Sequence, residues 1–176
     1  MKILIQVFFF FLPHLSFSQA GNATVTRNGY QLQYPTTWRL DTTGVMGSEL
    51  FVFSPLTDTA DTFSENVNLL IQNLAGMNID LKAYKEITDK QLAQMFTDSK
   101  VDESAIIQDG GKEYYRVSYA MTQENRPLKV TSICFIKDEK AYLITYTAMA
   151  NAYEQYKKIG EEMLSSFLAR SYLKNL

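Results

Sequence analysis

KEYYRVSYAMTQENRPLKVTSICFIKDEKAYLITYTAMA, residues 112–150, is the stretch that decides the fold of this chain. Polar and apolar residues alternate over three runs, which is the pattern of β-strands. The runs are Lys112–Gln123, Leu128–Lys137 and Ala141–Ala150. The connections Glu124–Pro127 and Asp138–Lys140 are short enough for hairpins. The stretch therefore predicts an antiparallel meander of three strands.

Shorter runs of strand-like sequence lie upstream of this block. Residues 30–34 alternate, residues 50–53 are a short apolar run, and residues 67–74 carry apolar side chains on both faces. The triplet Asp109-Gly110-Gly111 predicts another tight turn, entered from a strand around 104–108, because glycine accepts the positive φ that such turns require. Together with the meander, these runs predict a mainly antiparallel central sheet of about six to seven strands.

Two segments carry helical periodicity instead. In Leu81–Phe96 and in Ala152–Leu168 the apolar residues gather on one side of a helix, and Asp80 is a suitable N-cap for the first. Each helix therefore has one apolar face to bury. Because several strands carry apolar residues on both sides, we expect helices on both faces of the sheet. The predicted fold class is α+β, with the layers of an α/β/α sandwich.

The first residues have the pattern of a secretory signal peptide. Residues 3–12 contain nine apolar side chains in ten behind the single cation Lys2. As a helix this run spans ~15 Å, half of the ~30 Å hydrocarbon core of a bilayer, so it is too short for a stable anchor. Small residues at Ser16 and Ser18 predict cleavage after Ser18, or alternatively after Ala20, and a soluble periplasmic or secreted protein. The alternative is that residues 3–12 form a buried element of the fold.

Cleavage after Ser18 divides the chain into four parts. Residues 1–18 are the signal peptide, and residues 19–28 are small and polar, which predicts a flexible N-terminal arm. Residues 29–169 contain all the expected strands and helices, and no Pro/Gly/Ser-rich linker interrupts them. They are expected to form a single domain, followed by a short C-terminal tail at residues 170–176.

Charge and residue usage exclude several classes of function. The chain has 17 Lys and Arg residues against 19 Asp and Glu residues, which disfavours a nucleic-acid partner because phosphate recognition needs a clustered basic surface. The only histidine, His14, lies inside the predicted signal peptide, so histidine-based catalysis and metal binding are not expected in the mature chain. No cofactor motif is present, and no cofactor is expected. The lone Cys134 lies in a strand-like run, where a thiol is expected to be a buried apolar group and not a nucleophile.

Five short stretches and the order of the expected elements give the chain a resemblance to a known superfamily. The order is paired N-terminal strands, a strand, a helix, a three-stranded antiparallel block and a terminal helix. Over about residues 29–169 the chain resembles the PsbP-like domains, a superfamily that includes the DcrB-like and Mog-type proteins. The stretches are GYQLQYPTTW at 29–38, FVFSP at 51–55, ENVNL at 65–69, LKAY at 81–84 and SSF at 165–167.

The resemblance implies an α/β/α sandwich that is used mainly as an accessory or protein-binding module and not as an enzyme. In photosynthetic members metal binding is associated with histidines, and the predicted mature chain has none, so no metal site is expected. Trp38 closes the first stretch, and we expect it to pack as a large apolar side chain against the sheet. A ligand-stacking surface is the alternative for this tryptophan.

Tyrosine is abundant, with 11 residues, and several lie on the strands of the 112–150 block. A dense group of tyrosines can form an amphipathic binding face, because each buries its ring and keeps a hydroxyl in water. Alternatively, the rings line both sides of a partly covered sheet. The candidate binding face consists of Trp38, Tyr114, Tyr115, Tyr119, Tyr142 and Tyr146.

Residues 54–66 are acidic and contain no cation. Asp58, Asp61 and Glu65 offer oxygen ligands to a hard cation such as Ca²⁺, but their spacing does not match the twelve-residue Ca²⁺ loop, so we expect a solvated acidic loop. Two short motifs leave covalent modification open. They are Asp58-Thr59-Ala60, which resembles an O-glycan acceptor, and Asn22-Ala23-Thr24, which matches the N-glycan sequon.

Three hypotheses about function follow. The leading one is an exported, non-enzymatic accessory domain that binds a protein or an envelope component through a sheet face or a groove. The second is a carboxylate-dependent enzyme, which needs a pocket where two carboxylates converge and one has a raised pKa. The third is a carrier for an apolar ligand, with a dry cavity between helix 152–168 and the sheet. The carboxylates considered for the second are Asp58, Asp61, Glu65, Asp102 and Glu103.

Overall fold

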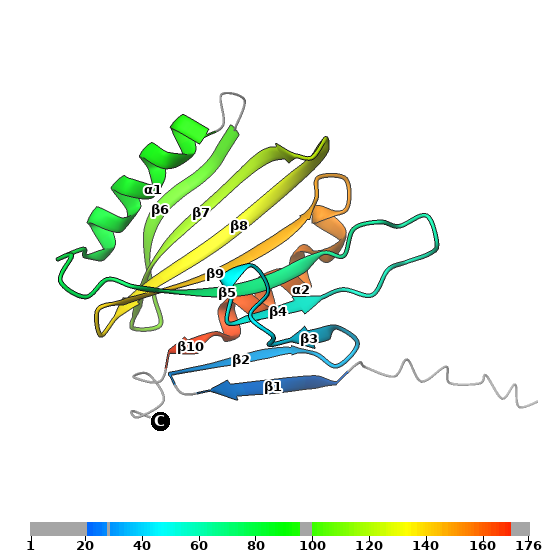
Figure 1. Cartoon of the computed structure of the whole chain (residues 1–176), viewed down its shortest axis with the longest axis horizontal. Coiled ribbons are helices and arrows are strands. Elements are labelled where there is room, and N and C mark those ends of the chain that lie inside the picture. The colour runs from blue at the N-terminus through cyan, green and yellow to red at the C-terminus, as the bar shows by residue number, and fades with distance from the viewer. Residues whose placement is uncertain (1–20, 28, 96–99, 170–176) are drawn as a thin grey trace, which may run out of the picture.

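The computed structural model describes residues 21–27, 29–95 and 100–169 (Figure 1). The predicted signal peptide, residues 1–18, and the predicted tail, residues 170–176, lie outside these ranges, as does Phe96. The described elements are β1 (Asn22–Arg27), β2 (Tyr30–Pro35), β3 (Arg39–Asp41), the 3₁₀ turn η1 (Val45–Gly47), β4 (Leu50–Phe53), β5 (Asn66–Asn73), α1 (Leu81–Met95), β6 (Lys100–Asp109), β7 (Lys112–Gln123), β8 (Arg126–Lys137), β9 (Lys140–Met149), α2 (Tyr153–Ser166) and β10 (Leu168–Ala169).

A seven-stranded antiparallel sheet in the order β3-β4-β5-β9-β8-β7-β6 forms the centre of the molecule. It confirms the predicted α+β class, and the predicted meander is β7, β8 and β9. Its hairpins are tighter than expected, because Glu124-Asn125 and Asp138-Glu139 each turn the chain with two residues at positive φ. Pro127 therefore lies within β8, opposite Ala150, the first residue after β9. Because proline has no N–H, the sheet loses one hydrogen bond at the very end of the β8–β9 pairing.

The prediction of a flexible arm at residues 19–28 is wrong for the part that the structure describes. β1 pairs with β2 along its whole length, and β10 pairs with β2 at Tyr30 and Gln31, so these strands form a separate three-stranded sheet. The domain thus begins near Asn22. The sequence NATVTR has almost no apolar alternation, and β1 is held by its ladder to β2 and by Val25 against the core.

The two faces of the main sheet are covered by different elements (Figure 1). α2 and the small sheet pack on one face, here called the α2 face, whose core includes Leu32, Ile144 and Phe167. α1 packs on the other face, the α1 face, over β6, β7 and β8, where Leu81 and Leu92 are buried. The two layers confirm the expected sandwich. Neither described helix has the length and hydropathy of a membrane-spanning segment.

α2 lies unusually close to the main sheet at one point. A Cβ atom added to Gly160 would lie 2.6 Å from Cγ of Tyr146 on β9, which is closer than real Cβ atoms approach a ring. Tyr146 is fully buried, and its hydroxyl donates to the carbonyl of Tyr153 at the start of the same helix. The missing side chain of Gly160 therefore lets the helix backbone rest on the tyrosine ring.

α1 is attached to the other face by a carboxylate. The helix begins after Asp80, whose Oδ1 accepts from the backbone N–H of Ala83 at 2.8 Å, as predicted for an N-cap. In its middle, Asp89 accepts from Lys85 on the helix at 2.6 Å, from Ser104 on β6 at 2.7 Å and from Tyr115 on β7 at 2.8 Å. Burial opposes ionisation of Asp89, but these three hydrogen bonds outweigh it and hold its pKa below the ordinary value.

We expect Gly160→Ala to destabilise the domain by about 1–3 kcal/mol, because the new methyl group overlaps the Tyr146 ring. At an exposed helical position the same change stabilises by up to ~1 kcal/mol. Urea unfolding followed by circular dichroism measures the difference. Gln155→Ala, an exposed position on α2, is the matched control and should change stability by less than ~0.5 kcal/mol. A Gly160→Ala protein as stable as the wild type would contradict the close packing.

Asp89 is expected to make stability depend on pH. Because its pKa is lower in the folded chain than the ~3.9 of an unfolded aspartate, its contribution is fully present above pH ~5 and is lost as the pH falls through the folded pKa. The stability difference between wild type and Asp89→Asn, measured by urea unfolding, should therefore be constant at pH 6–7 and shrink towards pH 3. Glu86→Gln, at an exposed position on the same helix, is the matched control and should change the free energy of unfolding at pH 7 by less than ~0.5 kcal/mol.

Candidate functional site

The predicted aromatic binding face is corrected by burial. Trp38, Tyr115, Tyr142 and Tyr146 are 5%, 0%, 7% and 0% exposed, so they cannot form a binding surface. The tyrosines also lie on opposite faces, because neighbouring residues alternate sides along a strand: Tyr115 and Tyr119 pack in the α1 core and Tyr114 in the α2 core. Trp38 packs edge-on against Tyr156 of α2 with ring centroids 6.0 Å apart, as expected for a core residue.

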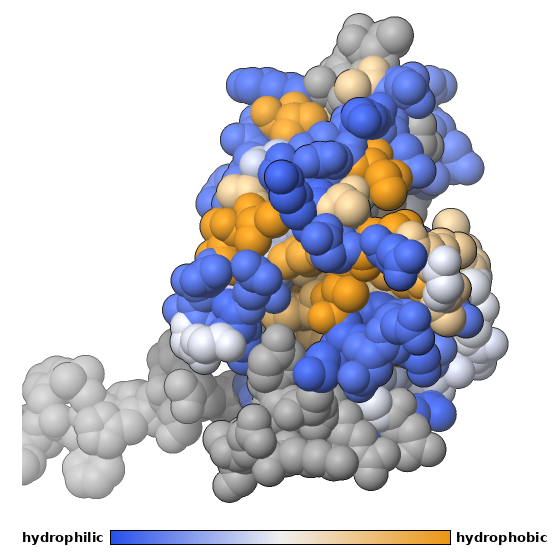
Figure 2. Space-filling model, turned by 90° about the vertical axis from the view of Figure 1, so that its left-hand side faces the viewer, coloured by the Kyte–Doolittle hydropathy of each residue, from blue (hydrophilic) through white to orange (hydrophobic). Residues whose placement is uncertain are grey.

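The exposed apolar surface of the described residues is aliphatic and not aromatic. Its large side chains are Val45, Met46, Leu56, Met77, Ile87 and Val101. Figure 2 shows the end of the molecule that carries α1 and the hairpin tips, where hydrophobic residues are surrounded by hydrophilic ones. Of the exposed side chains, Met77 precedes α1 and Ile87 lies on it. These exposed side chains belong to several separate elements, η1, β6, α1 and the loops before β5 and α1.

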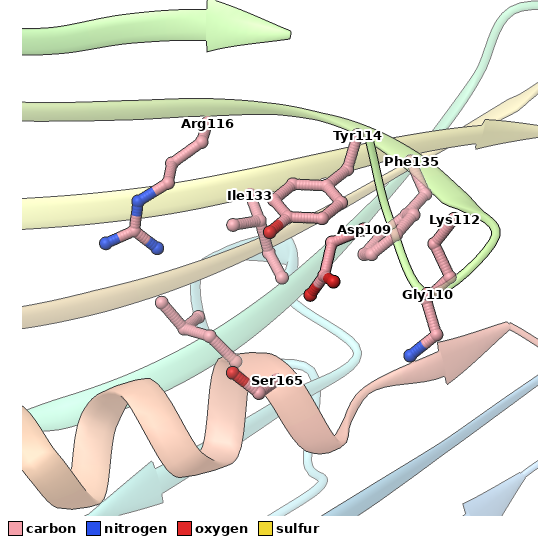
Figure 3. A pocket seen from close by; sticks show the side chains of 9 residues that line it. Asp109, Gly110, Lys112, Tyr114, Arg116, Ile133, Phe135 and Ser165 are labelled. Atoms are coloured by element: carbon pink, nitrogen blue, oxygen red, sulfur yellow. The ribbon is translucent and has the colours of Figure 1, made fainter. Parts of the chain in front are cut away.

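One pocket, here called the hairpin pocket, lies between the β6–β7 hairpin and the last turn of α2 (Figure 3). Its volume is about 120 Å³, enough for about four water molecules or one small side chain. Tyr114 and Asp109 point into it from the strands, and Ser165 points into it from the helix. Ile133, Phe135 and Leu164 form its apolar part, and Lys112 and Arg116 complete its charged rim. Of the predicted aromatic residues, Tyr114 is the one that lines this pocket.

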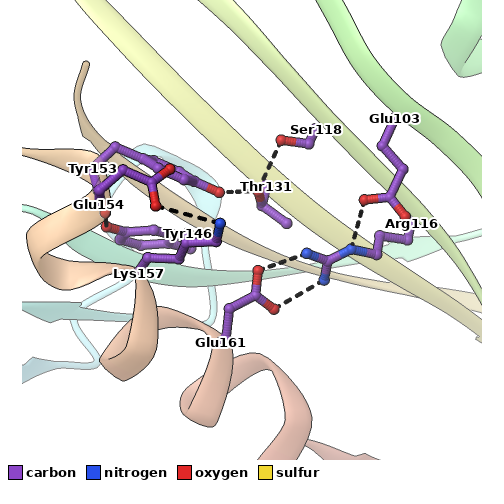
Figure 4. Close-up of polar contacts among 9 residues, drawn as sticks. All are labelled: Glu103, Arg116, Ser118, Thr131, Tyr146, Tyr153, Glu154, Lys157 and Glu161. Carbon is purple, nitrogen blue, oxygen red and sulfur yellow. Dashed lines mark hydrogen bonds and ion pairs between the residues drawn. The ribbon is translucent and has the colours of Figure 1, made fainter. Parts of the chain in front are cut away.

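Arg116 joins β7 to β6 and to α2 at the edge of the hairpin pocket (Figure 4). Its Nε donates to Glu103 on β6 at 2.9 Å, while Nη1 and Nη2 donate to the two carboxylate oxygens of Glu161 on α2 at 3.0 and 2.6 Å. This two-point contact is the geometry in which arginine holds a carboxylate most firmly. Hydrogen bonding to Glu161 raises the pKa of Arg116 above its ordinary value despite partial burial. The guanidinium thus fixes one wall of the pocket.

A buried row of hydroxyl groups continues from Arg116 along the sheet (Figure 4). The hydroxyl of Thr131 on β8 donates to Ser118 on β7 at 3.1 Å and lies 2.5 Å from the hydroxyl of Tyr153 on α2. All three residues are at most 6% exposed. Lys129 adds its ammonium group 4.8 Å from the centre of the Tyr153 ring and an ion pair with Asp102. These contacts lock the helix onto the strands and leave the row inaccessible.

A larger depression, here called the β2 pocket, lies between β2 and the opposite side of the last turns of α2. Its volume is about 380 Å³. Tyr34 contributes a half-buried ring, and Ser165 lines this pocket as well as the hairpin pocket. The two pockets therefore meet at Ser165, and we call them together the Ser165 surface. The remaining lining residues of the β2 pocket are Asn22, Gln33, Pro35, Ile159, Glu162, Met163 and Ser166.

The acidic loop 54–66 uses its carboxylates to hold its own shape. Asp58 accepts from the backbone N–H groups of Ala60 and Asp61, and Asp61 accepts from those of Thr57 and Phe63. The bonds to Asp61 hold the pKa of its carboxyl below the ordinary value. Within the described residues no cluster of three or more His, Cys, Asp and Glu side chains could hold a metal ion.

The five candidate carboxylates do not meet in one pocket. Asp58 and Asp61 accept hydrogen bonds from backbone groups of their own loop. Glu65 is 3% exposed and accepts from Ser54 Oγ at 3.2 Å. Glu103 forms an ion pair with Arg116, and Asp102 forms one with Lys129. The interface between α2 and the sheet also leaves no room for an apolar ligand. Gly160 contacts the Tyr146 ring there, and the neighbouring core is filled by Met163, Leu164 and Phe167.

Cys134 is fully buried, and burial raises the pKa of its thiol to about 12.

The residues of the Ser165 surface were largely missed by sequence reasoning. One local signal for them exists. Tyr114, Arg116 and Ser118 alternate as a polar set with the apolar set of β7, which marks a strand face that a helix covers only in part. No local pattern brings Tyr34 together with the end of α2, because these residues are more than a hundred positions apart in the chain.

Arg116→Gln is expected to destabilise the domain by about 1–3 kcal/mol, because it leaves the carboxylates of Glu103 and Glu161 without their shared partner. Arg126→Gln is the matched control. Arg126 makes an exposed ion pair with Glu124 at 3.7 Å, so its loss should cost less than ~0.5 kcal/mol. Equal midpoints of urea unfolding for the two variants would show that the bridge from β7 to α2 contributes nothing.

Comparison with solved structures places the fold among known ones. The chain is similar to cyanobacterial PsbP (CyanoP) from Synechocystis sp. PCC 6803, with a TM-score of 0.60 at 15% identity over 88% of this chain and 95% of that one. It is also similar to LpqN of Mycobacterium tuberculosis, with a TM-score of 0.63 at 11% identity over 85% of this chain and 90% of that one. Its similarity to PA94 of Pseudomonas aeruginosa has a TM-score of 0.54 at 10% identity over 78% of this chain and 89% of that one. No curated protein matches the chain by sequence.

The sequence itself matches a family model over nearly the whole described domain. That model covers residues 22–169, from the first residue of β1 to the last residue of β10. The match includes both sheets, both helices and the Ser165 surface. The chain belongs to the PsbP family.

Proposed function

We propose that this protein is an exported, non-enzymatic accessory module that binds a protein or another component of the cell envelope, and that it binds through the Ser165 surface. The observation that carries the proposal is the meeting of two pockets on a rigid frame. The frame is stiff because the last turns of α2 are tied to β7 by Arg116 and to β2 by Ser166. Side chains on such a frame are positioned before a partner arrives, which lowers the cost of binding.

The chemistry of the Ser165 surface suits recognition. The hairpin pocket combines an apolar floor with a rim of both charges, Asp109 against Lys112 and Arg116. A surface of this kind accepts one apolar group of a partner and orients it through polar contacts at the edge. The strongest polar contacts nearby hold the fold itself, since Arg116 is taken by Glu103 and Glu161. Asp109 and Tyr114 from the hairpin and Ser165 from α2 also face the pocket, and these are the polar groups that a partner can contact.

One of the comparisons supports a role in the envelope. The structure of LpqN is described as that of a protein involved in cell envelope biogenesis, and the fold of this chain is similar to it. The predicted signal peptide, with an apolar run behind Lys2 and small residues at Ser16 and Ser18, would bring the chain to the same compartment.

Site-specific photocrosslinking in the cells that produce the protein tests the proposal. A benzophenone amino acid replaces Ser165, which is exposed, or Tyr114, whose ring it resembles, in the full-length chain. The same amino acid at Lys90, exposed on α1 of the opposite face, is the control. We expect a discrete adduct in the envelope fraction from Ser165 and Tyr114 and none from Lys90. Equal labelling at all three positions, or no adduct at Ser165 and Tyr114, would refute the proposed site.

A further inference from the structure

The β2 pocket has an apolar floor and a polar, almost uncharged rim. Tyr34, Ile159 and Met163 supply the apolar part, and the ring of Tyr34 is half-buried against the core. At about 380 Å³ the pocket lies within the range of ~300–1,000 Å³ that small-molecule sites occupy. It is therefore large enough for a ring-sized ligand with one apolar and one polar aspect.

The polar side chains on the rim are exposed and can both donate and accept hydrogen bonds. Asn22 and Gln33 carry amides, and Ser165 carries a hydroxyl. Among the residues that the structure describes, the carboxylate of Glu162 is paired with Lys158 at 4.0 Å, and both side chains are more than half exposed. A ligand that presents many hydroxyl groups satisfies such a mixed set, because each hydroxyl also donates and accepts.

The backbone edge of β2 in this pocket is already occupied, which argues against an extended peptide. Ser166 Oγ accepts from the N–H of Gln33 at 3.1 Å and offers its proton to the carbonyls of Gln33 and Met163. Pro35 has no N–H, and its carbonyl accepts from the N–H of Trp38 at 2.9 Å. A peptide strand would need these same groups in order to pair with β2. What the pocket offers a ligand is therefore side chains and not a sheet edge.

The charges that line the β2 pocket further limit the chemical class of ligand that fits it. Among the described residues, the lining of the β2 pocket contains no Lys, Arg or His, and Lys158 beside the rim is already paired with Glu162 at 4.0 Å. This lining therefore disfavours a phosphate, a sulfate or a carboxylate. Glu162 is the one carboxylate among the described lining residues, and a hard cation needs several oxygen ligands, so this lining does not suit such a cation. A neutral ligand remains. The C–H face of a sugar ring packs on tyrosine, and its hydroxyl groups meet amides, hydroxyls and a carboxylate at the rim.

We propose that the β2 pocket binds a neutral carbohydrate, with Tyr34 as the stacking ring and Asn22, Gln33, Ser165 and Glu162 as hydrogen-bonding partners. This inference rests on the proposed function, since it assigns a ligand class to one half of the Ser165 surface. Tyr34 determines the position of the sugar ring, and the rim residues determine which hydroxyl configurations fit.

Affinity electrophoresis of the full chain tests the carbohydrate site. Native gels contain soluble β-glucan, pullulan, mannan, galactan or glycol chitin, and alginate serves as the anionic contrast. We expect at least one neutral polysaccharide to retard the wild-type protein and alginate to have no effect. Tyr34→Ala should weaken that retardation by about tenfold, Tyr34→Phe should keep most of it, and Glu162→Gln should weaken it less than Tyr34→Ala does. Gln155→Ala, which lies on α2 outside both pockets, should migrate like the wild type.

Two results would overturn the inference. One is the absence of retardation by every neutral polysaccharide; the other is equal retardation of wild type and both Tyr34→Ala and Glu162→Gln proteins that retain their circular dichroism spectrum. The photocrosslinking experiment separates this failure from that of the proposed function. If Ser165 forms an adduct with a protein and no glycan retards the chain, the proposed binding function stands and the proposal of a carbohydrate ligand is wrong. No adduct at Ser165 or Tyr114 would remove the proposed function itself.

Discussion

The close contact between Gly160 and the Tyr146 ring is the constraint on which the arrangement of this domain depends. It sets the distance between α2 and the main sheet, because no side chain separates the helix backbone from the ring at this point. With that distance set, Tyr153 reaches Thr131 and the two oxygens of Glu161 reach Arg116. The last turn of the helix then meets β2 through Ser166. Both pockets are consequences of this placement, since each has α2 as one wall.

The two faces of the sheet combine an apolar core with a carboxylate bridge in different proportions. The α2 face has the larger apolar core, in which the rings of Tyr30 and Tyr142 both pack against Phe167. On the α1 face a smaller core is joined by the carboxylate of Asp89, which binds two strands and its own helix at once. Apolar burial is nearly independent of pH, whereas a carboxylate is not. Acid is therefore expected to weaken the attachment of α1, because protonation of Asp89 removes its contacts with β6 and β7.

Much of the fold was predictable because its signals are local. Apolar periodicity identified the meander, both helices and β4, and glycine marked the turn between β6 and β7. The elements that were missed have no such signal. β1 is polar and Thr-rich, β3 has three residues and β10 has two, so each exists only because a partner strand is present. The candidate site was missed for the same reason, apart from Tyr114, because its walls come from β2, the β6–β7 hairpin and α2.

By itself the sequence determined the fold class, the family resemblance and the residue types available for chemistry, since these depend on side-chain pattern and composition. It did not determine which tyrosines are buried. Tyr114 and Tyr115 are neighbours in the chain, yet one lines a pocket and the other is fully buried. A strand turns neighbouring side chains to opposite faces, and only the packing of α1 and α2 decides how much of each face is covered. Tertiary structure alone therefore placed the pockets where distant segments meet.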